Sequence, residues 1–126
     1  MVRQLGQLGQ LEAAIMSRLW DWGRPVAVRE VLDDLVKERP LAYTTVMTVL
    51  DNLHGKGLVD RTKDGRAFLY VPVLTREEHT AGLLRQVLSS STDRSAALLH
   101  FVGALSDREV VELRSVLDER SEDETP

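Results

Sequence analysis

The sequence predicts a mainly α fold of the α+β class, in which three short helices lead into a β-hairpin and three more helices follow. Three observations support this expectation. Apolar residues recur at helical spacing as far as Leu53, two short runs rich in β-branched and aromatic residues then flank Asp64-Gly65, and helical signals return after Pro72. Asp-Gly between two such runs is a strong signal for a two-residue hairpin turn.

Apolar stripes predict the first three helices. The first helix begins near Gly9, because closely spaced glycines oppose an earlier start, and it stops at Gly23-Arg24-Pro25. The second ends before Pro40, since a residue that precedes proline avoids the α region. The three stripes consist of Leu8, Leu11, Ile15, Leu19 and Trp22, then Val28, Val31, Leu32 and Leu35, then Val46, Val49, Leu50 and Leu53.

The third helix is expected from about Tyr43 to Lys56. Gly57 stands where a glycine commonly follows a helix. Thr44 is the better N-cap by residue type, although the apolar stripe permits a start one or two residues earlier.

The hairpin is expected to pair residues 58–63 with residues 67–73, with Lys63 and Arg66 flanking its tip. Three helices followed by a hairpin make a winged helix-turn-helix, in which the second and third helices form the helix-turn-helix. We therefore assign residues 1–74 to a winged-helix DNA-binding domain.

Two capping boxes open helices in the second half of the chain. Thr75 is followed three residues later by Glu78, and Ser106 by Glu109. A polar break at residues 89–93 separates the first of these helices from a short middle helix, and the acidic end from Glu119 onward is expected to fray. Residues 75–126 are thus predicted to form a helical dimerisation region of three helices with an acidic C-terminal tail.

One face of the third helix suits contacts with DNA bases. Opposite the apolar stripe stand short polar side chains that can reach base edges, and threonine also offers a methyl group to thymine. The predicted recognition residues are Thr44, Thr45, Met47, Thr48 and Asn52. For backbone contacts we expect Lys63 and Arg66 in the wing, with Arg29 and Arg3 as weaker candidates.

The net charge of −4 argues at first against DNA binding. The charge is unevenly distributed, because residues 1–74 have a net charge of +1 and residues 75–126 of −5. A small basic footprint within residues 52–74 fits a module that touches few phosphates.

Catalytic and metal sites are not indicated. The chain has no cysteine, and its three histidines, His54, His79 and His100, show no ligand spacing. No phosphate-binding loop, dinucleotide motif or nucleophile elbow occurs, so we expect neither an enzyme nor a cofactor. No apolar stretch approaches the roughly 20 residues of a membrane span. We therefore expect a cytoplasmic protein without membrane insertion.

Several runs in residues 8–73 are specific enough to indicate a family. They are Leu8-Gly9-Gln10-Leu11-Glu12, Leu19-Trp20, Ala42-Tyr43-Thr44-Thr45-Val46-Met47-Thr48-Val49-Leu50, Lys56-Gly57-Leu58-Val59 and Tyr70-Val71-Pro72. Together they resemble the penicillinase-repressor (BlaI/MecI) family of winged-helix transcriptional regulators, and the similarity continues more loosely through residues 97–102 and the last helix.

The resemblance implies a homodimer whose winged helices bind a dyad-symmetric operator and whose C-terminal helices interlock. It also implies control of genes for β-lactam response or other stresses, and a membrane-bound sensor protease as partner. Family members are typically cleaved at an Asn-Phe bond, where this chain has His100-Phe101 as the candidate cleavage site. Asn52 stands where many members have arginine, which suggests a different operator contact.

The C-terminal helices have more apolar residues than they can bury alone, so they are expected to pack either on the first half of the chain or on a second copy. Dimerisation is the preferred explanation, since helix-turn-helix proteins read two half-sites about 34 Å apart. The candidate dimerisation residues are Leu84, Val87, Leu88, Leu98, Phe101, Val102, Leu113 and Leu117. The alternative is a winged-helix protein-interaction module without specific DNA readout, because architecture alone does not settle function.

Overall fold

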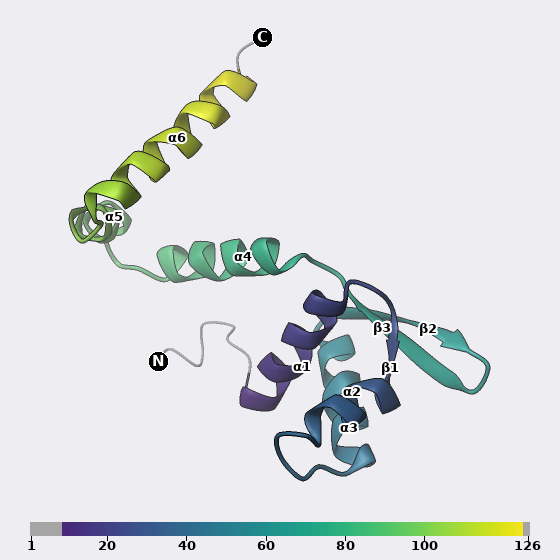
Figure 1. Ribbon diagram of the computed structural model, residues 1–126. Helices are drawn as coiled ribbons and strands as arrows, with labels where there is room; N and C mark the ends of the chain where they lie inside the picture. The colour runs from purple at the N-terminus through teal and green to yellow at the C-terminus, as the bar shows by residue number, and fades with distance from the viewer. Residues whose placement is uncertain (1–8, 125–126) are drawn as a thin grey trace. The chain divides into compact units, whose positions relative to one another are not determined.

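The computed structural model describes residues 9–124 (Figure 1). Arg3 and Leu8, both named above, lie outside the described residues. The chain divides into two compact units, one up to Gln86 and one from Val87 onward. The mainly helical winged-helix fold is confirmed, with the helices and hairpin in the expected order.

The first unit contains α1 (Gln10–Trp22), β1 (Val26–Ala27), α2 (Val28–Leu35), α3 (Tyr43–Gly55), β2 (Val59–Asp64) and β3 (Ala67–Pro72). The three strands form an antiparallel sheet in the order β1-β3-β2. Figure 1 shows the β2–β3 hairpin projecting beyond α1, α2 and α3. Sequence reasoning missed β1, because a two-residue strand between two helices has no alternating pattern.

Nine of the thirteen residues in the core of the first unit come from the predicted stripes, and Met16, Val26, Val59 and Tyr70 complete it. Its buried residues are Ile15, Met16, Leu19, Val26, Val28, Val31, Leu32, Leu35, Val46, Leu50, Leu53, Val59 and Tyr70. Leu11, Trp22 and Val49 pack against this core but are only partly buried. The three helices and the sheet therefore share one apolar interior, which holds α3 firmly on the unit.

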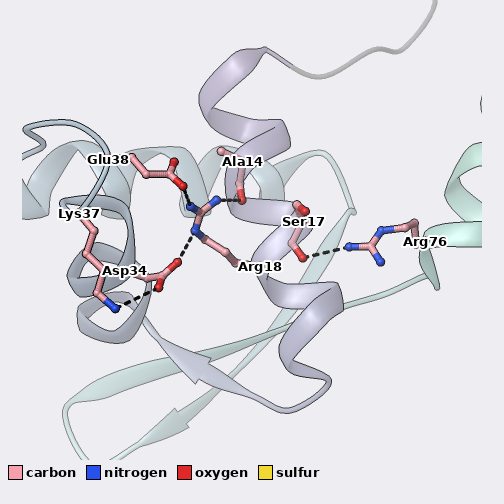
Figure 2. Close-up of polar contacts among 7 residues, drawn as sticks. All are labelled: Ala14, Ser17, Arg18, Asp34, Lys37, Glu38 and Arg76. Carbon is pink, nitrogen blue, oxygen red and sulfur yellow. Dashed lines mark hydrogen bonds and ion pairs between the residues drawn. The ribbon is translucent and has the colours of Figure 1, made fainter.

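Arg18 reinforces the packing of α1 against α2. Its guanidinium donates to Asp34 at 2.6 Å and to the Ala14 carbonyl oxygen at 3.0 Å, and it forms an ion pair with Glu38 at 2.9 Å (Figure 2). Lys37 lies 3.6 Å from the other Asp34 oxygen. Only 16% of the Arg18 side chain is exposed, so its charge is held by these partners.

The hairpin turn differs by one residue from the expected one. Asp64 pairs with Ala67, so the two loop residues are Gly65 and Arg66 and not Asp64-Gly65. Gly65 has φ 65°, whereas Arg66 does not have a positive φ. This is the pattern of a type II′ turn, which places glycine first, and the turn therefore selects Gly65 as its first central residue.

α3 begins at Tyr43, the earlier start that the apolar stripe permits, and ends at Gly55. The N-cap is Ala42, whose carbonyl oxygen accepts from Thr45 and Val46, so Thr44 is already helical and does not cap the helix. The buried stripe on α3 outweighs the capping preference of threonine. At the other end Gly57 has φ 79° and follows the C-cap, as expected.

The second half of the chain contains α4 (Arg76–Ser89), α5 (Arg94–Gly103) and α6 (Asp107–Glu124). Both capping boxes form: Glu78 N–H donates to Thr75 Oγ1 at 3.0 Å, and Glu109 N–H donates to Ser106 Oγ at 3.2 Å. The expectation that the acidic end frays from Glu119 was wrong, because α6 continues to Glu124. Glutamate and arginine are good helix formers, and no helix breaker precedes Pro126.

The division between the units lies inside α4, beyond the sequence boundary at residues 74/75. The first turn of α4 is attached to α1. Arg76 donates to Asp21 at 2.8 Å and to the Ser17 carbonyl oxygen at 3.2 Å (Figure 2), and the Trp20 and His79 rings lie 5.3 Å apart. Residues 76–79 therefore belong structurally to the first unit.

Candidate nucleic-acid interface

The exposed face of α3 presents the predicted recognition residues together. Thr44, Thr45, Met47, Thr48 and Asn52 are all exposed. The opposite face of the helix is anchored in the core by residues that are fully buried, namely Val46, Leu50 and Leu53. The helix thus has the two faces that groove binding requires, one apolar and fixed, the other polar and free to contact a ligand.

A second edge of α3 faces the hairpin. Tyr43, Met47 and Asp51, spaced four residues apart, border a hollow whose opposite wall is formed by the hairpin. That wall includes Arg61, Arg66, Ala67, Phe68 and Tyr70. Met47 is therefore at the border between the polar face of α3 and the hairpin.

The basic residues of this region fall into two classes. Lys56 forms an ion pair with Glu12 at 2.8 Å, and Arg61 forms one with Asp51 at 2.9 Å. Lys63 and Arg66 are exposed and form no ion pair with any residue that the structure describes. The free cations of the wing are therefore the two that sequence reasoning selected.

Arg29 lies close to the start of α3. It is exposed at the beginning of α2, and its guanidinium carbon lies 5.2 Å from the centroid of the Tyr43 ring. This cation–π contact positions a positive charge beside the first turn of α3, whose unpaired N–H groups also attract anions. Sequence reasoning did not foresee the contribution of Tyr43.

Two ionisable groups near the interface have shifted pKa values. The hydrogen bond from Lys56 lowers the pKa of the Glu12 carboxyl, so the carboxylate that ties α1 to the end of α3 is ionised at neutral pH. Burial raises the pKa of the Tyr70 phenol, which remains protonated and donates to Asp51 at 3.3 Å. Both contacts fix α3 relative to its neighbours.

Sequence reasoning missed Asp51 and Arg61 as part of this region. Their ion pair joins α3 to β2, and Arg61 also lies opposite Tyr70 in the sheet. The pairing depends on strand register, which cannot be read from the sequence before the turn is known. The sequence contains a weak signal for Asp51, because this residue follows the predicted recognition residue Met47 by one helical turn.

The candidate dimerisation residues lie on helices that lack a core of their own. Leu84, Val87, Leu98, Phe101, Val102 and Leu117 are exposed, and Leu88 and Leu113 are partly buried. No residue of α4 or α5 is buried. His100 and Phe101, the candidate cleavage site, are consecutive exposed residues within α5.

Within residues 9–124 no group of three or more histidine, cysteine or acidic residues could hold a metal ion. In the same part of the chain, no helix is long and apolar enough to cross a membrane.

Comparison with known proteins identifies the family. The family model for the penicillinase repressor matches residues 8–119. The transcriptional regulator BlaI of Mycobacterium tuberculosis is 45% identical over 92% of this chain and 86% of its own length. The penicillinase repressor of Bacillus licheniformis is 25% identical over 94% of each chain.

A solved structure is similar to the winged-helix part of the chain. The solution structure of the DNA-binding domain of the repressor BlaI is 27% identical and superimposes with a TM-score of 0.50, covering 59% of this chain and 89% of that one. The similarity in fold thus agrees with the similarity in sequence. The chain is a member of the penicillinase repressor family.

Proposed function

We propose that the protein is a transcriptional repressor that binds a dyad-symmetric DNA operator as a homodimer, in the cytoplasm where its DNA lies. The observation that supports this most directly is the exposed polar face of α3, together with Lys63 and Arg66, the two wing cations without an ion-pair partner in the described chain. Relatives described as a transcriptional regulator and a penicillinase repressor support the same function.

In this proposal α3 lies in the major groove and reads bases. Thr44, Thr45, Thr48 and Asn52 offer hydroxyl, methyl and amide groups to base edges, and Asn52 suits a bidentate contact with adenine. Met47 contributes an apolar contact at the edge of this face. These residues supply selectivity, since none of them has a charge.

Affinity then comes from other parts of the interface. Lys63 and Arg66 contact phosphates from the wing, and Arg29 contacts the backbone near the first turn of α3. Arg3 is proposed as a further backbone contact. Because few phosphates are neutralised by one chain, two chains on one operator are needed for tight binding.

The homodimer is proposed from the unburied apolar residues of α5 and α6. Phe101 is 55% exposed and Leu117 is 56% exposed, although large apolar side chains of a folded protein are mostly covered. A second copy offers the same surface, and a two-fold axis would match the symmetry of an operator. A sensor protease that cuts at His100-Phe101 would separate the dimer, since the bond lies within α5.

The proposal is tested by selecting duplexes from a random DNA pool with the wild-type chain and measuring binding by fluorescence anisotropy. We expect the selected DNA to bind about 10³-fold or more tightly than a scrambled duplex of equal length at moderate salt. Equal binding to the two duplexes would refute specific DNA readout and favour a protein-interaction module.

Single variants separate the two kinds of contact. Asn52→Ala should cost about 1–3 kcal/mol on the selected DNA and relax the sequence preference. Lys63→Ala and Arg66→Ala should weaken binding to all sequences and flatten the salt dependence by about one unit each. Arg108→Ala, which removes an exposed cation at the start of α6, is the matched control and should leave the slope unchanged.

A further inference from the structure

Two side chains of the hairpin, Arg61 and Tyr70, bind one carboxylate of α3, that of Asp51. Arg61 Nη1 donates to Asp51 Oδ1 at 2.9 Å, and the guanidinium carbon lies 4.3 Å from the centroid of the Phe68 ring. The Tyr70 hydroxyl donates to the same Asp51 oxygen at 3.3 Å. One carboxylate on α3 thus holds a side chain from each strand of the hairpin.

This attachment lies where the sheet changes from three strands to two. β1 pairs only with Leu69 and Tyr70, so the part of the hairpin beyond Leu69 has two strands. Two-stranded ribbons twist more strongly than wider sheets and are only marginally stable alone. Lys63 and Arg66 both lie in that part, which means that their direction depends on what fixes the hairpin at Arg61.

The charge of Asp51 makes this arrangement unexpected for a DNA-binding helix. Asp51 is the one acidic residue in the sequence of α3, and half of its side chain is exposed. Without Arg61 a carboxylate at this edge would repel phosphates. An exposed ion pair contributes little to folding stability, so stability is a poor explanation for the pair.

We propose that Asp51 and Arg61 are positioning residues that hold the wing at the angle at which Lys63 and Arg66 reach the DNA backbone while α3 occupies the groove. Phe68 stacks on the guanidinium and restricts its orientation, and Tyr70 restricts the carboxylate. This role rests on the proposed function. The DNA contacts of Lys63 and Arg66 then depend on Asp51 and Arg61, which need not touch DNA themselves.

Whether one substitution strengthens or weakens DNA binding distinguishes this positioning role from a simple effect of charge. Asp51→Asn removes a negative charge from the DNA-facing side, which by charge alone should strengthen binding. The positioning role instead predicts that binding to the selected DNA weakens, by about tenfold, because the phosphate contacts of the wing are lost. Asp60→Asn removes the same charge from the neighbouring exposed position on β2 and should not weaken binding.

A double-mutant cycle tests whether the two residues act as one unit. Asp51→Asn, Arg61→Met and the double variant should all weaken binding to a similar degree and flatten the salt dependence as Lys63→Ala does. If Arg61→Met weakens binding while Asp51→Asn strengthens it, Arg61 is itself a phosphate ligand and the positioning role is refuted. An unchanged thermal midpoint in each variant establishes that it is folded.

A measurement without DNA completes the test. In the wild-type chain the heteronuclear NOE of backbone amides 63–68 should be close to that of α3, and it should fall in Asp51→Asn but not in Asp60→Asn. Unchanged wing order in Asp51→Asn would overturn the positioning role whatever DNA the wild type binds. A wild-type chain that selects no DNA would instead overturn the proposed function.

Discussion

The first unit and the C-terminal helices α5 and α6 use apolar residues in opposite ways. All thirteen buried apolar residues of the described chain lie between Ile15 and Tyr70. In the second unit Leu99 is 73% exposed and Val111 is 66% exposed. The first unit therefore has an interior of its own, whereas α5 and α6 leave large apolar side chains exposed. The first unit is therefore expected to fold whether or not copies of the chain associate.

The largest effect is expected from a buried leucine of α3. Leu50 is fully buried on α3, so Leu50→Ala should lower the free energy of unfolding of the first unit by about 2–5 kcal/mol. Urea denaturation followed by tryptophan fluorescence measures this, because Trp20 and Trp22 both lie on α1.

Leu99→Ala is the matched control in the other region. Its side chain is exposed, so the unfolding free energy of the first unit should change by less than about 0.5 kcal/mol. Equal losses of unfolding free energy from Leu50→Ala and Leu99→Ala would show that the two regions share one core, and would contradict the difference between them.

The next effect concerns assembly. Phe101→Ser and Leu117→Ser should each weaken self-association by about 2 kcal/mol or more, if these side chains are central to the interface between copies. Analytical ultracentrifugation over a concentration series measures the change. Val36→Ser, at an exposed valine of the first unit, should leave the dimer intact. A chain that is monomeric before any substitution would contradict the dimer directly.

Acid should destabilise the first unit through three carboxyl groups. Hydrogen bonds from Lys56, Arg24 and Arg18 lower the pKa values of Glu12, Glu30 and Asp34 below their ordinary values of 4.5, 4.5 and 3.8. A carboxyl group whose pKa is lowered by folding stabilises the folded state fully at pH values above its ordinary pKa. This stabilisation is lost as the pH falls through the pKa that the group has in the folded state. The unfolding free energy should therefore decline below about pH 4.5.

Lys56→Met sharpens the pH test. It removes the main cause of the low Glu12 pKa, so the decline of the unfolding free energy with acid should become shallower than in the wild type. Urea titrations at a series of pH values compare the two chains. A decline as steep as that of the wild type would show that the Glu12 pair contributes nothing to acid sensitivity.

The smallest effect concerns the helix that connects the two units. Thr75 caps α4, so Thr75→Ala should cost about 1 kcal/mol of local stability and speed amide hydrogen exchange in the first turn. Thr80→Ala removes a threonine from the same helix whose hydroxyl donates to the Arg76 carbonyl oxygen and caps nothing. Similar exchange rates in the two variants would argue against a capping role for Thr75.

Local and periodic features of the fold were predictable from the sequence. The stripe Val46, Leu50 and Leu53 defined the buried face of α3 and hence its exposed one, and Gly57 marked its end. The capping boxes at Thr75 and Ser106 were equally readable, because each depends on residues three apart.

Features that depend on tertiary register were not predictable. The turn residues are Gly65-Arg66 and not the predicted Asp64-Gly65, because the pairing of Asp64 with Ala67 determines which residues form the turn. The Asp51–Arg61 pair depends on that register and on the packing of the hairpin against α3. Periodicity also could not tell whether the stripes of α5 and α6 cover each other or a partner.

In the proposed repressor the first unit binds DNA while α5 and α6 join two copies. Hydroxyl-radical footprinting of the full chain on its selected DNA tests this arrangement most directly. Two copies joined through α5 and α6, each with α3 in a major groove, predict two symmetric protected patches whose centres lie about 10 base pairs apart or a multiple of that. A single protected patch, or protection without symmetry, would contradict the account.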